Sequence, residues 1–397
     1  MKLAPPDRFA DGIALGFEDV LIAPGQALVN TDGLNLRTAL TAGIALSQPF
    51  IVTTSQGEQA IACAQQGVIG FVPSSLSPSA QAAAVRAVKR YQTRVVQNPI
   101  TVTIETSIAE VADLQTRYDI SGIPVLEVSS QRVIGIVTKE SITPKTDMEQ
   151  PVSTIMSQDG LIMLQDSGNV DEVDALMRKH GVKRIILTDR DQRCIGMVTT
   201  RDMDRIRSTP KACMDTRSRL RVGAVIGIED QDMDRVAMLI DEQVDALMVV
   251  GSPLHIKKTS DMITHIRRQR AGHVDVIVGP VMTKAQARAW IDAGANALFL
   301  SPEIPADYLA CGIGTKPFSM ILELADACAV QSIPLFFQGT ATGDVYCKAV
   351  AGGVYGFIVD DTVNRDTVTE ALKQGMLRLG CSSLEQMRTE PRFIRLK

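Results

Sequence analysis

The sequence predicts an α/β protein, a TIM-type (β/α)8 barrel interrupted by a smaller module that is itself duplicated. Strand-like apolar runs alternate with helical patterns after residue 220, and residues 93 to about 208 contain an internal repeat. The outer stretches, 1–92 and 209–397, together make 281 residues. An eight-fold barrel typically needs about 250 residues, so these two stretches suffice for one barrel.

The barrel elements follow one another in order along the chain. A helix is expected over 60–66, a strand over 68–72 and a helix over 78–90, and the repeated module then interrupts the barrel. After it, strands are expected over 222–226, 246–250, 274–278, 297–300, 333–337 and 356–359. The helices between them are expected over 232–243, 260–270, 284–293, 318–330 and 343–351. Repeating βα units with short loops indicate a parallel sheet.

The interrupting module consists of two copies related by a fixed spacing. Gly135 in the first copy is equivalent to Gly196 in the second, which gives a period of 61 residues. Each copy predicts a short strand, an amphipathic helix, two more strands and the start of a helix. The predicted domains are the N-terminal part of the barrel at 1–92, the first copy at 93–150, the second at 151–208 and the rest of the barrel at 209–397.

The last strand of each copy runs into a helix through a recognisable motif. The second copy reads Gly196-Met-Val-Thr199-Thr-Arg-Asp202, and the first has Thr138 and Ser141 at the matching positions. This arrangement resembles a tandem pair of CBS modules (a Bateman module). The resemblance implies that Thr138, Ser141, Thr199 and Asp202 contact an adenine or guanine nucleotide.

Helix capping is the alternative interpretation of these four residues, because Ser, Thr and Asp are ordinary N-caps. For the second copy capping and nucleotide binding stay equally open, and for the first copy capping is favoured. Five nearby basic residues could contact phosphates, although solvated charge is their commoner use: Arg178, Lys179, Lys183, Arg184 and Arg201.

The barrel segments resemble the IMP dehydrogenase and GMP reductase family over nearly the whole chain. Matching segments include Phe17-Glu-Asp-Val-Leu-Ile-Ala-Pro24, Ala212-Cys-Met-Asp215 and the C-terminal Arg392-Phe-Ile-Arg-Leu-Lys397. The resemblance implies a barrel that binds a purine mononucleotide and transfers a hydride to or from a nicotinamide cofactor. The catalytic segments of this chain nevertheless depart from the family pattern.

The first departure concerns the nucleophile. In the family a Gly-Ser-x-Cys-Thr-Thr-Arg loop supplies the thiolate that attacks the purine. The corresponding stretch here, 300–314, is shortened, and Pro305 stands near the catalytic position. Cys311, about six residues downstream, is the weak candidate for a replacement, and a buried thiol is the favoured alternative for it.

The second departure concerns the phosphate and the ribose. The family's Asp-Gly-Gly loop reads Gln338-Gly339-Thr340 here, and its Gly-Ser loop reads Asp360-Asp361. The ribose carboxylate is therefore lost at Gln338. Two acidic side chains also stand where the resemblance implies a dianionic phosphate, which they would repel.

The remaining departures concern the nicotinamide side and the lid. The family's Asp-x-Ala-His-Gly segment maps onto 250–255 without its aspartate, so NAD is not expected to bind. The family's long mobile flap is replaced by the short connection 360–365. Such a connection is too short to carry a lid that excludes water.

Composition excludes several other classes of function. Lys and Arg total 41 against 45 Asp and Glu, and aromatic residues make up 4% of the chain, so we expect no nucleic-acid partner. No apolar run reaches the roughly 20 residues that a membrane-spanning helix needs. The seven cysteines and four histidines show no metal-binding spacing, and the unpatterned cysteines suit a reducing cytoplasm.

These observations predict a degenerate family member, a pseudoenzyme whose CBS pair senses a purine nucleotide. The family architecture implies a homo-oligomer, a tetramer or higher, and hetero-association with an active IMP dehydrogenase is a further expectation. The alternative is residual or altered IMP dehydrogenase or GMP reductase activity through Cys311. A third hypothesis, a new metal site, would use Glu303, Asp307, Asp360 and Asp361.

Overall fold

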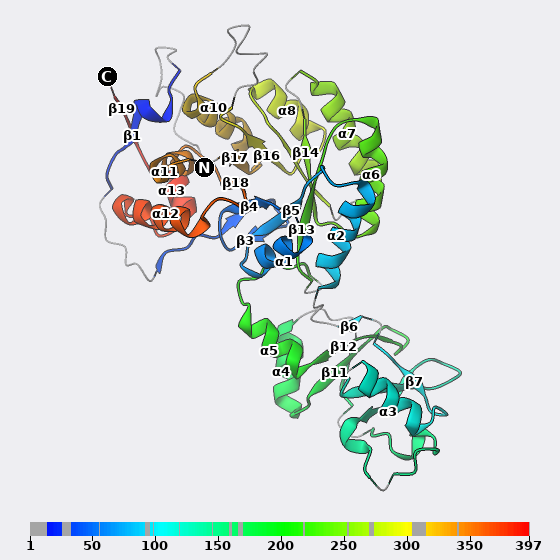
Figure 1. Ribbon diagram of the computed structural model, residues 1–397. Coiled ribbons are helices and arrows are strands. Elements are labelled where there is room, and N and C mark those ends of the chain that lie inside the picture. Colours follow the sequence, from blue (N-terminus) through cyan, green and yellow to red (C-terminus); the bar gives the residue numbers. More distant parts are fainter. Residues whose placement is uncertain are drawn as a thin grey trace. The chain divides into compact units, whose positions relative to one another are not determined.

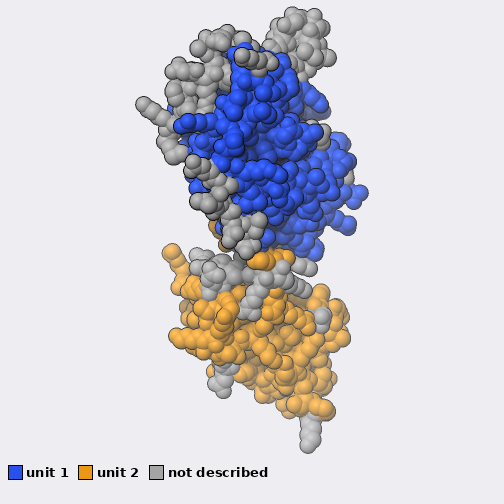
Figure 2. Space-filling view, turned by 90° about the vertical axis from the view of Figure 1, so that its left-hand side faces the viewer, with its two compact units in different colours: residues 1–91, 211–213, 220–397 blue, residues 92–210, 214–219 orange. Residues whose placement is uncertain are grey.

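The computed structural model divides the chain into two compact units (Figures 1 and 2). Unit 1 comprises 1–91, 211–213 and 220–397, and unit 2 comprises 92–210 and 214–219. The structure describes residues 14–25, 33–54, 56–91, 96–97, 99–118, 120–144, 146–158, 161–165, 170–216, 219–251, 254–269, 274–303, 315–339 and 341–396.

Unit 1 is a closed barrel of eight parallel strands, so the predicted fold class is confirmed. Around the barrel the strands are β4 (Phe50–Thr53), β5 (Ile69–Val72), β13 (Val222–Ile226), β14 (Ala246–Val250), β15 (Asp275–Gly279), β16 (Ala297–Leu300), β17 (Leu335–Gln338) and β18 (Gly356–Asp360). Register pairs such as Ile51 with Ile69 and Ile358 with Ile51 close the ring. Most strand residues are buried, as expected for a parallel sheet covered on both faces.

Helices surround the barrel and connect successive strands (Figure 1). They are α1 (Gly57–Gln65), α2 (Pro78–Arg90), α6 (Asp230–Asp241), α7 (Ile256–Arg268), α8 (Lys284–Asp292), α10 (Pro317–Ala329), α11 (Gly343–Ala351), α12 (Arg365–Leu379) and α13 (Leu384–Thr389). Local sequence sets several boundaries. Ser77 caps α2 by accepting from the amide of Ala80, and α12 ends at Gly380 with a left-handed φ of 72°.

Short strands outside the ring complete unit 1. β2 (Thr38–Ala39) pairs with β3 (Ala45–Leu46), and Leu40, Ile44 and Leu46 of this hairpin pack into the barrel core. β1 (Val20–Ile22) pairs antiparallel with β19 (Phe393–Arg395), which joins the two ends of the described chain (Figure 1).

Unit 2 contains two copies of one small α/β motif. The first copy has β7 (Val102–Thr103), α3 (Ile108–Arg117), β8 (Gly122–Leu126) and β9 (Val133–Thr138), followed by a 3-10 turn over Lys139–Ser141. The second has β10 (Met163–Gln165), α4 (Val170–His180), β11 (Arg184–Thr188), β12 (Cys194–Thr199) and α5 (Thr200–Ser208). β6 (Val96–Gln97) pairs with β12.

The two copies share sheet topology and turn geometry. In each, the first strand pairs parallel with the second and the second pairs antiparallel with the third. The hairpin turns use Gln131 (φ 58°) and Gln192 (φ 63°), two left-handed residues that stand one repeat apart. Matching backbone strain at matching positions supports the internal duplication.

Among the described residues, no helix combines the length and the apolar character that crossing a bilayer requires.

Candidate functional site

At the carboxyl end of β18, the Asp360 side chain is bound by its own chain. Its Oδ1 accepts from the backbone amide of Thr362 at 2.9 Å and from the Thr362 hydroxyl at 2.5 Å. These two bonds, the hydroxyl first, hold the pKa of the exposed Asp360 carboxyl below its usual value. The group is therefore a fixed negative charge at neutral pH, and it already uses an amide of the loop that follows β18.

The start of α12 is also satisfied internally. Only residues 361–364 separate β18 from α12. The side chain of Asn364 accepts from the amides of Asp366 at 3.1 Å and Thr367 at 3.3 Å. Since helix N-terminal amides are common anion ligands, their use by Asn364 leaves fewer of them for a phosphate.

The ends of β14 and β15 carry few groups suited to a dinucleotide. Val250 is the last residue of β14 and Gly251 follows it, and the next described residues are the exposed Leu254 and then His255, the N-cap of α7. After β15, the Thr283 hydroxyl accepts from the amide of Gln286 at 3.2 Å and so caps α8. Thr283 thus has a structural role that the sequence alone does not reveal.

The predicted nucleophile segment, including Pro305 and Cys311, lies outside the described residues. The described cysteines, all free thiols, have pKa values raised by burial. Burial raises the pKa of Cys194 and Cys347 to about 11 and that of Cys213 and Cys328 to about 12. None of these thiols is therefore an activated thiolate at neutral pH.

The residues of the hypothetical metal site are not seen to converge. Asp307 lies outside the described residues, and Glu303, Asp360 and Asp361 are exposed. Within the described part of the chain, no three His, Cys, Asp or Glu side chains are grouped closely enough to hold a metal ion.

A cavity of about 450 Å³ lies inside unit 2, and we call it the inter-repeat pocket. Thr138, Glu140 and Ser141 come from the end of the first repeat, and Lys183 and Arg184 come from the second. The rest of the lining consists of Ile136, Ser157, Leu161, Ile162, Val182 and Ile186. Its size lies in the range of small-molecule sites, about 300–1,000 Å³, and its lining is mostly apolar with a few polar groups.

Charged groups of opposite sign meet in this pocket. Arg184 Nη2 donates to the backbone oxygen of Ser121 at 3.0 Å and to its hydroxyl at 2.9 Å. Burial lowers the Arg184 pKa, and the charge of Glu140 partly offsets that effect. The Glu140 pKa is lowered by its own backbone amide, by the Thr138 hydroxyl and then by the charges of Arg184 and Lys183.

The structure places the predicted nucleotide residues of the two repeats differently. Thr138 and Ser141 are half-buried, contact each other (Oγ1 to Oγ, 3.3 Å) and line the inter-repeat pocket. Asp202 is 6% exposed, and its Oδ2 accepts from the amide of Thr199 at 2.7 Å and from its hydroxyl at 2.6 Å. Both pairs make the contacts of helix caps, and neither Thr199 nor Asp202 is among the residues that line this pocket. The nucleotide role of all four residues stays a prediction.

Replacing Asp202 by Ala is expected to lower the local stability of the second repeat by about 1–2 kcal/mol, because it removes a buried cap. Hydrogen exchange followed by mass spectrometry measures this as faster exchange in β12 and α5 of the full chain. Asp113→Ala, which breaks an exposed pair with Arg117 in the first repeat, is the control and leaves exchange in α5 unchanged. Unchanged exchange in D202A would show that the cap does not stabilise α5.

The sequence did not point to Glu140 as a site residue, and Arg184 was one of five basic residues that could contact phosphates, with solvated charge as their commoner use. Both residues are next to predicted ones. Glu140 precedes Ser141, a candidate nucleotide contact, and Arg184 follows Lys183, a candidate phosphate contact. The two residues do not occupy equivalent positions in the repeats, because Glu140 follows β9 and Arg184 begins β11, so the repeat pattern gives no signal for this pair.

A closed (β/α)8 barrel interrupted after its second helix by a duplicated α/β unit defines the class of the protein. The family model for the IMP dehydrogenase / GMP reductase domain matches residues 14–358, and the chain belongs to that family.

Curated relatives and solved structures agree with this assignment. The inosine-5'-monophosphate dehydrogenase of Aquifex aeolicus (strain VF5) is 32% identical over 351 residues, covering 85% of this chain and 71% of that protein. The enzyme of the same name from Escherichia coli (strain K12) is 32% identical over 358 residues, covering 87% and 72%.

Among solved structures, GMP reductase from Trypanosoma brucei in complex with guanosine 5'-triphosphate is similar, with a TM-score of 0.72 and 24% identity over 98% of this chain and 99% of that one. A variant of that enzyme in complex with guanosine 5'-monophosphate has a TM-score of 0.72 at 22% identity, covering 99% and 97%. These likenesses support the fold.

Proposed function

We propose that this chain keeps the family scaffold but has lost turnover of purine mononucleotides, and that unit 2 binds a purine nucleotide. Its role is regulatory or scaffolding in purine nucleotide metabolism. The observation that carries the loss of turnover is the Asp360 carboxylate, held ionised on the Thr362 amide in the loop after β18. The family resemblance implies that the substrate phosphate binds at this loop.

Charge repulsion at that position disfavours a phosphorylated substrate. Two like unit charges 4 Å apart repel by about 1 kcal/mol in bulk water and by about 4 kcal/mol near a protein surface, and the exposure of Asp360 puts its contribution toward the lower figure. A phosphate group carries about −1.5 to −2 at neutral pH, and it would meet Asp360 and the neighbouring exposed Asp361. Asp360 would also have to give up its amide and hydroxyl bonds before that loop could hold the phosphate.

The family implies a nicotinamide dinucleotide, and the described residues do not fit one. The position of the family's aspartate maps to the end of β14, where Val250 and Gly251 offer no carboxylate. The four-residue link 361–364 offers no lid to close over the reacting groups. The described residues therefore support no nicotinamide chemistry in this chain, and NAD is not expected to bind.

The purine nucleotide is assigned to unit 2 because its repeats have the topology and motif expected of a CBS pair. The described lining of the inter-repeat pocket combines an apolar wall, three hydroxyl side chains, two basic groups and one carboxylate, which suits a base, a ribose and a phosphate. The T. brucei GMP reductase structures contain guanosine 5'-triphosphate and guanosine 5'-monophosphate, so guanine nucleotides are the first ligands to test.

A regulatory role requires a partner, and we propose two kinds. The barrel self-associates into a homo-oligomer, a tetramer or higher, and it also associates with an active IMP dehydrogenase. The free thiols among the described cysteines agree with a cytoplasmic location.

The second candidate function is residual or altered IMP dehydrogenase or GMP reductase activity through Cys311. The 32% identity to curated IMP dehydrogenases and the complete barrel favour it.

Turnover assays separate the two candidates. We expect NADH formation from IMP and NAD, and NADPH consumption with GMP, to lie at least about 10³-fold below those of a competent family enzyme assayed in parallel. We expect turnover to be this low because several catalytic segments that act together in the family are lost in this chain. Turnover above that limit that disappears in Cys311→Ser would overturn our proposal and establish the second candidate. The same variant is the control for any background oxidation.

A further inference from the structure

The inter-repeat pocket carries a specific balance of charge. Among the described residues that line the pocket, Glu140, Lys183 and Arg184 are charged, two cations against one anion. Both cations act on the Glu140 carboxylate and help to keep it ionised. An entering phosphate group therefore meets a net charge of one positive unit rather than two free basic groups.

The rest of the described lining offers apolar side chains and hydroxyl groups. Leu161, Ile162, Val182 and Ile186 belong to the second repeat and offer an apolar surface for a planar base. Thr138 and Ser141 place hydroxyls beside Glu140, as hydrogen-bond partners for sugar hydroxyls. A carboxylate can only accept hydrogen bonds, so Glu140 suits hydroxyl donors and opposes additional phosphates.

We propose that the inter-repeat pocket selects a purine nucleoside monophosphate over the corresponding triphosphate, and that Glu140 is the residue that sets this preference. The inference rests on the proposed function of unit 2 as a purine-nucleotide site. A monophosphate carries a charge of about −1.5 to −2 at neutral pH, and a triphosphate carries about twice as much. The positive charge of the pocket therefore offsets the charge of a monophosphate more completely than that of a triphosphate.

The position of Arg184 supports this selectivity. Its guanidinium is held by both oxygens of Ser121, and a Cβ on the adjacent Gly122 would lie 2.8 Å from its Nε. Gly122 thus leaves space for the Arg184 side chain to cross the strand. A guanidinium fixed in this way meets one phosphate group and cannot follow a longer chain of them.

Isothermal titration of the full-length protein with GMP, GTP, AMP, ATP and IMP tests the proposal. Magnesium is left out, so that the triphosphates keep their full charge. We expect each monophosphate to bind at least about tenfold more tightly than its triphosphate. Glu140→Gln is expected to narrow this ratio to about threefold or less, chiefly by tightening triphosphate binding, because the exposed carboxylate acts through a partly screened charge.

Two control variants show whether the effect is specific to Glu140. Glu110→Gln removes an exposed carboxylate from α3 of the same unit and should leave the ratio unchanged. Lys183→Met, at an exposed position, should weaken mono- and triphosphates alike, and it does not depend on the packing of the half-buried Arg184.

The outcomes distinguish this inference from the proposed function. No binding of any nucleotide would overturn the assignment of unit 2 as a nucleotide site and this inference with it. Triphosphates binding as tightly as monophosphates, or a ratio unaffected by E140Q, would overturn the selectivity alone.

Discussion

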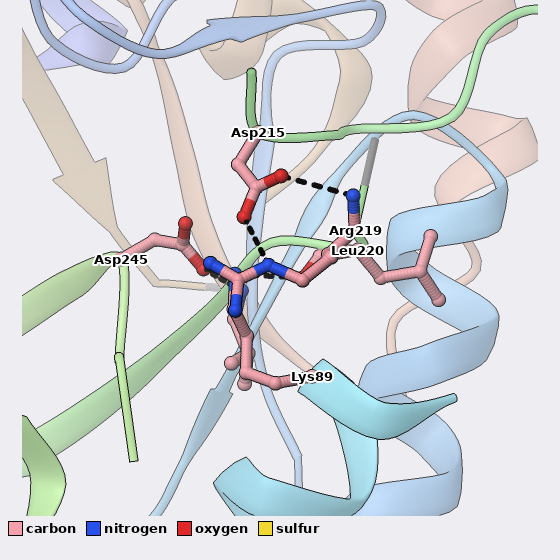
Figure 3. Close-up of polar contacts among 6 residues, drawn as sticks. Lys89, Asp215, Arg219, Leu220 and Asp245 are labelled. Carbon is pink, nitrogen blue, oxygen red and sulfur yellow. Dashed lines mark hydrogen bonds and ion pairs between the residues drawn. The ribbon is translucent and has the colours of Figure 1, made fainter. Parts of the chain in front are cut away.

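Replacing Lys89 by Met is expected to lower the free energy of unfolding of the barrel by about 3–5 kcal/mol. The Lys89 side chain is 5% exposed and pairs with Asp245 at 2.8 Å, while its ammonium also donates to the backbone oxygen of Leu220 at 3.2 Å (Figure 3). Removing the cation takes from the buried Asp245 carboxylate the ammonium that pairs with it, and the weaker compensation of this desolvated charge is the source of the cost.

This pair joins the two places where the barrel chain is interrupted. Lys89 lies near the end of α2, just before unit 2, and Leu220 lies just after it. Asp245 also accepts from the amide of Val222 at 2.9 Å, at the first residue of β13. Within unit 1, one buried ion pair therefore holds both the end of α2, where the chain leaves the barrel, and the start of β13, where the chain re-enters it.

The returning segment has its own support inside unit 2. Arg219 Nε donates to the Asp215 carboxylate at 2.9 Å, and the Arg219 amide donates to the same group at 2.9 Å (Figure 3). The ends of the insertion are therefore set by local polar contacts on each side of the unit boundary.

Denaturant unfolding followed by tryptophan fluorescence measures the effect of Lys89→Met, because the single tryptophan, Trp290, lies in unit 1. Arg86→Met is the matched control. Arg86 stands on the same helix and pairs with Glu242 at the surface, so its loss should cost less than about 1 kcal/mol.

The double variant Lys89→Met with Asp245→Leu should recover much of the loss, since it removes both buried charges. A cost for K89M no larger than that for R86M would show that the pair does not hold the ends of the insertion.

The repeating pattern of the sequence was enough to predict the barrel. Continuous apolar runs mark buried parallel strands, and the helices over 78–90 and 343–351 have the predicted bounds. The predicted start of α7 at 260 was wrong, because the helix begins at Ile256 after the unconventional N-cap His255. A polar first turn, Lys257 and Lys258, conceals that start from hydrophobic periodicity.

The site could be predicted only where the signal is local. The motif at the repeat ends identified Thr138 and Ser141, and both line the inter-repeat pocket. The proximity of Glu140 and Arg184 depends on how two repeats pack, which no periodic pattern encodes. The bond from the Thr362 amide to Asp360 could have been predicted, because an Asp side chain commonly accepts from the backbone amide two residues further on.

Replacing Trp290 by Ala is expected to lower the free energy of unfolding by about 3–5 kcal/mol. Trp290 lies in α8 and is fully buried, and its Nε1 donates to the backbone oxygen of Ile256 at 3.4 Å. Ile256 is the first residue of α7, so the indole links α8 to the beginning of the preceding helix. Its removal leaves a cavity and an unmade bond at the same place.

Far-UV circular dichroism in denaturant measures this cost, since the variant lacks the fluorescent side chain. Trp290→Phe keeps most of the apolar volume and should lose only about 1–2 kcal/mol. Val330→Ala, at an 84% exposed position after α10, should change stability by no more than about 0.5 kcal/mol. A cost for W290A similar to that for V330A would mean that α8 is not packed as described, and the arrangement of helices around β14 and β15 would then need revision.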